Sequence, residues 1–287
     1  MTGLEVKRVG IVGSGQMGGG IAEVAARAGI DGVLRARAIA SAESTVAGID
    51  RSLARQVSKG KLDDAERELI LSRITATDDL AELADCDLVI ESVVEDLAVK
   101  KPLFAELDAV CRPDAVLATN TSTLSVIELA VQTKRPEQVC GIHFFNPAQV
   151  MSLVEVVRPL TATDSTIATA KAFAVECGKD AVDVKDRAGF IVNALLFPYL
   201  NNAVRMLENA TATREDIDIA MKGGCNFPLG PFQLLDLVGI DTSVSILDTL
   251  YQEFKDPNYT PVPTLRRMVE AGLLGRKSGR GFYNYRT

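Results

Sequence analysis

The segment RVGIVGSGQMG, residues 8–18, decides the fold of this chain. It opens with a short apolar run rich in β-branched residues, which predicts a strand over 8–13. A glycine-rich turn follows at once, and the amphipathic stretch after it predicts a helix over 16–29. Strand, glycine turn and helix in this order begin a βαβ unit, and such units build doubly wound parallel sheets.

The glycines of this turn have the G-x-G-x-x-G spacing of a dinucleotide-binding loop. The first glycine would allow a tight turn, the second would let the backbone approach a pyrophosphate, and the third would let helix and strand pack closely. The helix N-terminus would then offer its N–H groups to the phosphates. We interpret five residues as cofactor-binding, namely Gly13, Gly15, Gln16, Met17 and Gly18; the alternative is a purely structural turn.

The acidic residue that usually ends the second strand of such a unit, about 20 residues further on, is absent. In GVLRAR the corresponding position is Ala36, between Arg35 and Arg37. The missing carboxylate removes repulsion of a 2′-phosphate, and an arginine such as Arg37 could bind that phosphate, so the pattern favours NADP slightly over NAD. Both arginines could instead be solvated, and Asp31 or Glu43 could supply the carboxylate in a shifted register. The choice between NAD and NADP stays open.

Apolar runs alternate with amphipathic ones as far as residue 185. The strands that we expect are 8–13, 32–36, 87–92, 115–119, 139–143 and 152–157, and helices include 16–29, 43–59, 64–72 and 164–178. This alternation predicts a Rossmann-type α/β fold with a doubly wound, mostly parallel sheet.

The pattern changes after residue 185. Four helices are expected, over 188–209, 214–222, 231–254 and 263–271, with no strand between them, and TRED (213–216) has the form of a capping box. We therefore predict two domains, a dinucleotide-binding domain over 1–185 and an all-α domain over 186–287.

Composition excludes several classes of function. The net charge of −7 argues against a nucleic-acid-binding surface. The five cysteines are scattered singly, which favours neither a metal site nor a disulfide framework and fits a reducing compartment. The most apolar run, FIVNALLFPYL, is too short to span a bilayer, and the N-terminus leaves no room for a signal peptide. These features predict a cytoplasmic protein without a metal, nucleic-acid or membrane partner.

His143 is the only histidine, and it ends a predicted strand, where doubly wound folds collect their ligands. Glu155 follows inside the apolar run SLVEVV. A buried carboxylate is costly without a partner, so Glu155 either faces solvent or pairs with another group, and His143 is the obvious candidate. Such a pair would give the imidazole the orientation and basicity of a general base. The alternative is a core histidine whose ring nitrogens are satisfied.

Asn193 shares a face of its predicted helix with the apolar residues Phe197, Leu200, Val204 and Leu207. A buried asparagine needs hydrogen-bond partners, and the sequence favours neither a packing role nor a functional one.

The sequence resembles the short-chain 3-hydroxyacyl-CoA dehydrogenase family, which includes bacterial 3-hydroxybutyryl-CoA dehydrogenases. The resemblance extends over nearly the whole chain and is carried by VGIVGSGQMGGGIA, DLVIESVVEDLAVKKPLF, ATNTSTLSV, GIHFFNPAQVMSLVEVV, DRAGFIVNALLFPYLNNAVRM, EDIDIAMKGGCNFPLGPFQLLDLVGIDT and LGRKSGRGFYNY. The histidine of HFFNP with its following glutamate, together with GFIVN, is highly specific.

The resemblance implies roles for individual side chains. His143 would be the catalytic base and Glu155 its partner, while Ser122 and Asn193 would position the substrate. Three further residues would lie near the nicotinamide half of the cofactor, namely Glu95, Lys100 and Asn120. Ala36 departs from the family, which usually has Asp or Glu there. The helical domain would close over the substrate and form a homodimer.

The implied reaction is hydride transfer between a nicotinamide dinucleotide and a 3-hydroxyacyl-CoA, with 3-hydroxybutyryl-CoA and acetoacetyl-CoA as the expected pair. One alternative is a dehydrogenase of an acyl-carrier-protein thioester or a free 3-hydroxy acid. Another is a non-enzymatic structural protein that binds a dinucleotide, although it would not need all four substrate-site residues together.

A basic stripe on the predicted helix 43–59 consists of Arg51, Arg55 and Lys59, and Lys61 extends it. Such a stripe opposite a core face is often only solvated. In the family context, Arg55 and Lys59 are candidates to bind the phosphates of coenzyme A.

Overall fold

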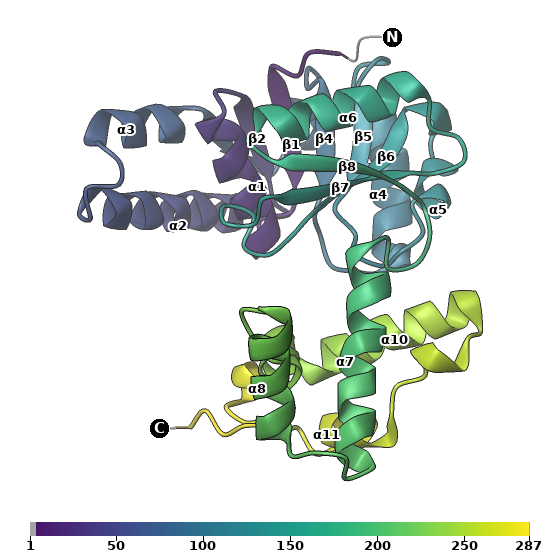
Figure 1. The fold of residues 1–287 in the computed structure, drawn as a ribbon. Helices are drawn as coiled ribbons and strands as arrows, with labels where there is room; N and C mark the ends of the chain where they lie inside the picture. The colour runs from purple at the N-terminus through teal and green to yellow at the C-terminus, as the bar shows by residue number, and fades with distance from the viewer. Residues whose placement is uncertain (1–3, 287) are drawn as a thin grey trace. The chain divides into compact units, whose positions relative to one another are not determined.

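The computed structural model describes residues 4–286, in which the chain forms two compact units. The first unit ends at Arg187 and the second begins at Ala188 (Figure 1). This division lies close to residue 185, where the alternation of strands and helices stops in the sequence. Within residues 4–286, every helix is too short or too polar to reach from one side of a lipid bilayer to the other.

The first unit is built on an eight-stranded sheet in the order β3-β2-β1-β4-β5-β6-β7-β8. Its strands are β1 (Arg8–Val12), β2 (Asp31–Arg35), β3 (Ile74–Thr77), β4 (Leu88–Glu91), β5 (Val116–Thr119), β6 (Val139–Phe144), β7 (Leu153–Arg158) and β8 (Asp180–Lys185). Neighbouring strands are parallel except β6 and β7, which are antiparallel. The predicted doubly wound, mostly parallel sheet is confirmed. The strand order reverses between β1 and β4. Such sheets bind their ligands beside the carboxyl ends of the strands at this point.

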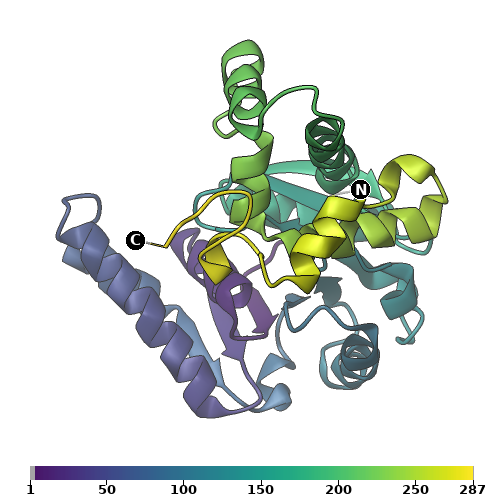
Figure 2. The same ribbon diagram turned by 90° about the horizontal axis from the view of Figure 1, so that it is seen from below.

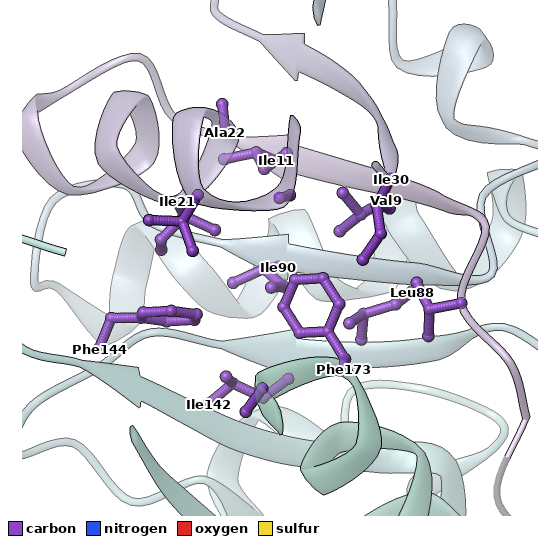
Figure 3. Packing of buried hydrophobic residues seen from close by; sticks show 14 of the residues in the cluster. Val9, Ile11, Ile21, Ala22, Ile30, Leu88, Ile90, Ile142, Phe144 and Phe173 are labelled. Carbon is purple, nitrogen blue, oxygen red and sulfur yellow. The ribbon is translucent and has the colours of Figure 1, made fainter. Parts of the chain in front are cut away.

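Helices cover both faces of this sheet. Ile21 of α1 (Gln16–Arg27) and Phe173 of α6 (Asp164–Glu176) pack with Ile90 and Ile142 of the strands in one apolar core (Figure 3). The other helices of the unit are α2 (Ile39–Val57), α3 (Asp64–Ser72), α4 (Leu97–Val110) and α5 (Ile127–Ala130), together with the short 3-10 turns η1 (Leu80–Leu83) and η2 (Pro136–Gln138). Of these, α2 and α3 pack side by side, and α2 is the long helix in Figure 2.

The strands β3 and β8 were not expected from the sequence. They form the two edges of the sheet, so each has only one neighbouring strand. Their sequences, ITAT and DAVDVK, lack the apolar runs of the central strands, and no residue of β8 is fully buried. A rule that looks for apolar runs therefore finds the centre of a sheet more readily than its edges.

The second unit is all-helical, as predicted, and has its own apolar core. Its helices are α7 (Val192–Glu208), α8 (Arg214–Cys225), α9 (Pro231–Val238), α10 (Ile240–Phe254) and α11 (Pro263–Glu270), with 3-10 turns η3 (Pro257–Tyr259) and η4 (Arg276–Ser278). Thr213 caps α8, because its hydroxyl oxygen accepts the N–H of Asp216 at 3.1 Å. The single helix expected over 231–254 is wrong: Gly239 has φ of +106°, which the helix cannot accommodate, and the chain turns there between α9 and α10.

Candidate active site

The glycine loop has the geometry that its spacing predicts. Gly13 has φ of +124°, and a Cβ at this position would lie 2.3 Å from the carbonyl oxygen of Ser92. A Cβ at Gly18 would lie 1.8 Å from the carbonyl oxygen of Gly13, so both positions require glycine. At Gly15 a Cβ would meet nothing within 4 Å. The backbone of Gly15 therefore borders open space in which a phosphate can lie.

The N-terminus of α1 fits an anion. The helix begins directly after Gly15, has no acidic side chain in its first turn and has no side chain that caps its N–H groups. Such N–H groups, at the positive end of the helix dipole, attract phosphate. Gln16 is exposed at this end, whereas the side chain of Met17 packs against the core. Loop and helix together therefore fit the pyrophosphate of a dinucleotide.

The end of β2 carries no acidic side chain. Ala36 is buried, Arg37 is exposed, and the Nε of Arg35 donates to the carbonyl oxygen of Asp78 at 3.2 Å. Asp31 lies at the opposite end of β2 and is 3.1 Å from Arg73, so it is too far along the strand to replace the missing carboxylate. The register shift that would have used Asp31 is therefore wrong.

A carboxylate that the sequence did not reveal lies near this corner. Asp78 follows β3, the neighbour of β2, and its Oδ2 accepts the N–H of Ile39 at 3.3 Å. Glu43, the other candidate from the sequence, is exposed on α2. Asp78 went unnoticed because β3 itself was not predicted, and only the strand order places it beside β2.

His143 and Glu155 form a buried cross-strand pair. They stand directly opposite each other in the antiparallel register of β6 and β7, which puts both side chains on the same face. Nδ1 of His143 lies 2.7 Å from Oε2 of Glu155, and the residues are 6% and 0% exposed. The ring of Phe145 packs against the imidazole with a centroid distance of 4.4 Å. Glu155 thus has a partner inside the protein, and its carboxylate orients the imidazole through Nδ1.

Asn120 connects the ends of three strands. Its Oδ1 accepts the N–H of Phe144 at 2.8 Å, and its Nδ2 donates to the hydroxyl of Ser92 at 3.2 Å. Phe144 directly follows His143, so Asn120 fixes the backbone at the end of β6. Asn120, which was expected near the cofactor, lies at the carboxyl ends of the strands, as the glycine loop does.

Ser122 lies on the loop after β5 and is held by Glu95. Oε1 of Glu95 accepts the N–H of Ser122 at 2.9 Å and lies 3.3 Å from its hydroxyl oxygen. Lys100 is 1% exposed, and its Nζ lies 3.3 Å from Oε2 of Glu95 and 2.6 Å from Oε1 of Glu91. The structure thus places Lys100 behind Glu95, inside the protein.

Glu91 was missed in the sequence. It ends β4, is 0% exposed and pairs with Lys100. A signal was present, because in the run DLVIES Glu91 follows three apolar residues directly, and in SLVEVV Glu155 likewise lies within an apolar run. Applied evenly, the rule that a buried carboxylate needs a partner would have identified both residues.

Asn193 belongs to the second unit, where it is 8% exposed near the start of α7. The apolar face predicted for this helix is present, with Phe197 and Leu200 buried. Asn201 on the same helix shows what a packing asparagine does. Its Oδ1 accepts the N–H of Val262 at 3.0 Å, and its Nδ2 donates to the carbonyl oxygen of Thr260 at 2.8 Å.

A hollow of about 270 Å³ lies beside the glycine loop, between α1 and α2. Its lining includes Gly20, Glu23, Ser52 and Gln149, and the side-chain amide of Gln149 donates to Glu23 at 2.9 Å. A neighbouring set of basic side chains is exposed, namely Arg51, Arg55, Lys59 and Lys61. The helix α2 ends at Val57, before the predicted end at residue 59, so Lys59 and Lys61 lie in the turn that follows it.

Comparison with known proteins gives a consistent result over both units. The family model "3-hydroxyacyl-CoA dehydrogenase, NAD binding domain" matches residues 8–187, and "3-hydroxyacyl-CoA dehydrogenase, C-terminal domain" matches residues 189–285. Among curated proteins, a 3-hydroxybutyryl-CoA dehydrogenase of Mycobacterium tuberculosis is 52% identical over 98% of this chain and 99% of its own length. One from Bradyrhizobium diazoefficiens is 46% identical over 98% of this chain and 96% of its own.

Solved structures agree with this result. The crystal structure of M. tuberculosis FadB2 superposes with a TM-score of 0.95 at 51% identity, over 99% of this chain and 100% of that one. The (S)-3-hydroxybutyryl-CoA dehydrogenase of Ralstonia eutropha superposes with a TM-score of 0.96 at 40% identity, over the same shares of the two chains.

Proposed function

Because the chain belongs to the 3-hydroxyacyl-CoA dehydrogenase family, we propose that its substrate pair is 3-hydroxybutyryl-CoA and acetoacetyl-CoA. The protein is an oxidoreductase that interconverts 3-hydroxyacyl-CoA and 3-oxoacyl-CoA with a nicotinamide dinucleotide. The observation that carries the proposed mechanism is the buried contact of 2.7 Å between Nδ1 of His143 and Oε2 of Glu155, at the sheet edge that also bears the glycine loop.

His143 acts as the general base for alcohol oxidation and as the general acid for ketone reduction. Its Nδ1 faces Glu155, so Nε2 is the nitrogen that takes the C3 hydroxyl proton. Glu155 favours the tautomer with hydrogen on Nδ1 and stabilises the imidazolium that forms. The bound dinucleotide supplies the hydride acceptor or donor. Proton transfer by a positioned base contributes roughly 10²–10⁴-fold in rate.

Ser122 and Asn193 position the substrate. A hydroxyl and a side-chain amide can both hydrogen-bond the oxygens of a 3-hydroxyacyl or 3-oxoacyl thioester, which fixes the reacting carbon for hydride transfer. The placement of Ser122 supports this role, because Glu95 holds its backbone N–H at 2.9 Å on the loop after β5. Glu95 and Asn120 line the same edge, on the side where the nicotinamide half of the cofactor is proposed to bind.

Arg55 and Lys59 bind phosphates of coenzyme A. Ser52 lines the hollow beside α1, and Arg55 lies about one helical turn further along α2, with Lys59 in the turn after it. Both basic side chains are exposed and thus accessible to an anionic ligand.

The protein uses both NAD and NADP, with weak discrimination. The position directly after β2, where a carboxylate would repel a 2′-phosphate, holds Ala36, and the nearby carboxylate of Asp78 accepts the N–H of Ile39. At the same time Arg35 is engaged by Asp78, which leaves the exposed Arg37 as the nearby cation on this loop. We expect the ratio of kcat/KM for NADPH and NADH to stay within about tenfold, since a single exposed cation such as Arg37 is not a built phosphate site.

The second unit forms a homodimer. Apolar side chains are exposed on three of its helices, with Leu195 of α7 71% exposed, Ile219 of α8 67% and Leu237 of α9 50%. Contiguous patches of exposed apolar side chains are typical of interfaces, and these three side chains are our candidates for such a patch. Their burial against a second copy would remove them from water.

Reduction of acetoacetyl-CoA by the purified protein tests the function. We expect turnover with NADH and with NADPH, and a much lower kcat/KM with free acetoacetate and with the acyl-carrier-protein thioester. Free acetoacetate has no phosphate, and the carrier-protein thioester lacks the adenosine 3′,5′-diphosphate part of coenzyme A, whose phosphates Arg55 and Lys59 would bind. Preference for the carrier-protein thioester or the free acid would overturn the assignment of the substrate. The product of this reduction is 3-hydroxybutyryl-CoA, and we expect its (S) enantiomer, as the name of the Ralstonia eutropha relative states for that protein.

A further inference from the structure

Five residues at the carboxyl ends of the central strands form a closed ring of ion pairs and hydrogen bonds, four of its links between side chains and one from a backbone N–H. Glu91 Oε1 lies 2.6 Å from Lys100 Nζ, which also lies 3.3 Å from Glu95 Oε2. Glu95 Oε1 accepts the hydroxyl proton of Thr121 at 2.5 Å. The hydroxyl of Thr119 donates to Glu91 Oε2 at 2.8 Å, and its oxygen accepts the N–H of Thr121 at 3.3 Å, which closes the ring.

The ring is anchored at Glu91. Glu91 and Thr119 are 0% exposed and Lys100 is 1% exposed, whereas the side chain of Glu95 is 37% exposed. Opposite charges at this separation interact strongly away from water, and removal of Lys100 would leave the carboxylate of Glu91 buried without its counter-ion. Glu91 accepts two further hydrogens, from the N–H of Val93 at 2.7 Å and from Thr119, so its carboxylate is fixed on several sides.

The exposed end of the ring holds the loop that carries Ser122. Glu95 Oε1 accepts the Ser122 N–H at 2.9 Å, and the hydroxyl oxygen of Thr121 accepts the N–H of Leu124 at 2.9 Å. Lys100 lies between the carboxylates of Glu91 and Glu95 and therefore helps to fix the position of the Glu95 side chain. The arrangement contains two carboxylates and one ammonium, and the carboxylate nearer to Ser122 is the more exposed one.

We propose that Glu91 is a positioning residue that acts through Lys100 and Glu95 on Ser122. This inference rests on the substrate-positioning role proposed above for Ser122. When Glu91 is neutral, the remaining anion next to Lys100 is Glu95. The ammonium then draws Glu95 toward itself and away from the backbone of Ser122, which displaces the serine hydroxyl from the substrate.

A double-mutant cycle between Glu91→Gln and Ser122→Ala tests this coupling, with kcat/KM for acetoacetyl-CoA as the readout. We expect Glu91→Gln alone to lower kcat/KM by about tenfold to a hundredfold, as a displaced substrate contact does. In the Ser122→Ala background the same change should cost less than about twofold, because the contact it acts on is already gone. Losses that multiply, or a Ser122→Ala enzyme with wild-type kcat/KM, would overturn the proposal.

A second comparison separates positioning from stability. Glu91→Gln leaves buried Lys100 with only the partly exposed Glu95 as its counter-ion and should lower the urea midpoint of unfolding, whereas Glu91→Gln/Lys100→Met removes both buried charges and should recover it. We expect kcat/KM to stay low in this double variant, because Lys100 then no longer holds Glu95 in place. Recovery of kcat/KM together with the midpoint would make Glu91 a merely structural residue and contradict the inference.

Lys101→Met provides the matched control. Lys101 follows Lys100 on α4 and also lies 2.6 Å from a glutamate, Glu128, but this ion pair is at the surface. Its removal should leave kcat/KM within about twofold of the wild type, since exposed pairs contribute little. A loss as large as that of Glu91→Gln would contradict the inference. The wild-type rate with acetoacetyl-CoA, measured in the same series, tests the proposed function separately.

Discussion

Glu155 and Glu91 are both fully buried carboxylates on central strands, and each is compensated by a specific partner within hydrogen-bonding distance. The partner of Glu155 could be predicted because the chain has only one histidine. The partner of Glu91 could not, because the chain has 31 lysines and arginines, and α4 was not placed against β4 by the sequence. The burial of a carboxylate shows that it needs a partner. The sequence identifies that partner only when the chain contains a single residue of the required type.

The coenzyme preference proposed above can be tested at Ala36. We predict that Ala36→Asp lowers kcat/KM for NADPH by about tenfold or more and changes that for NADH by less than about threefold, because the new carboxylate repels a 2′-phosphate. Steady-state kinetics with both coenzymes provide the measurement. Ala36→Asn, which has nearly the same size without the charge, is the control and should leave the preference of the wild type. An equal loss with both coenzymes in Ala36→Asp would contradict this explanation.

At the scale of elements, the strand–turn–helix at the start of the chain can be predicted from local sequence, because the requirement for glycine at Gly18 comes from residues of the motif itself. A Cβ at Gly18 would collide with the backbone of Gly13, five positions earlier, and this close approach is built into the motif itself. Elements whose positions depend on distant parts of the chain were harder to predict. The edge strands β3 and β8 and the break at Gly239 are examples. The two edge strands lack the continuous apolar runs of the central strands, and the apolar helical pattern continues on both sides of Gly239.

Two glycine variants separate folding from cofactor binding in this element. Gly15→Ala should keep the urea midpoint of the wild type, because its Cβ meets nothing within 4 Å, but it should weaken dinucleotide binding by about tenfold or more, because the phosphate needs that space. Gly18→Ala should lower both, because its Cβ would overlap the Gly13 carbonyl. Fluorescence titration with NADH and urea unfolding are the measurements. Normal binding by Gly15→Ala would refute the placement of the phosphate.

The reactivity of each cysteine thiol depends on how deeply its part of the fold buries it. Burial raises the pKa of Cys86 to about 11 and the pKa values of Cys111, Cys140 and Cys177 to about 12. Cys225, at the end of α8, is exposed. Near neutral pH the first four thiols therefore stay protonated and unreactive, and we predict that an aromatic disulfide reagent modifies only Cys225 rapidly in the native protein. All five should react in denaturant, and rapid native modification of a second cysteine would show that the core is more open than described here.

At the scale of the whole molecule, the sequence predicted a doubly wound sheet followed by a helical unit, because a change from alternating strands and helices to helices alone is visible in hydrophobic patterning. The same patterning does not show which side chains meet. The cross-strand contact of His143 with Glu155 depends on the antiparallel pairing of β6 with β7, and a parallel β7 would have given a different register. Tertiary pairing, rather than residue spacing, therefore assembles the site.

The proposed dimer is tested by the molar mass in solution. We predict that the wild type has a mass near twice 30.7 kDa by light scattering and that Leu195→Asp shifts it toward the monomer, because a charge would be buried in the interface. Leu160→Asp is the matched control: Leu160 is 98% exposed in the first unit, outside the proposed interface, and its replacement should leave the mass unchanged. A monomeric wild type would contradict the proposal.

The central claim is that His143, oriented by Glu155, transfers the substrate proton. Its most direct test is the turnover of His143→Gln with acetoacetyl-CoA, measured together with NADH affinity by fluorescence titration. Because glutamine cannot act as a base near neutral pH, we predict that kcat falls by about a hundredfold or more while the Kd for NADH changes less than about twofold. A His143→Gln enzyme that turns over at the wild-type rate would contradict the account.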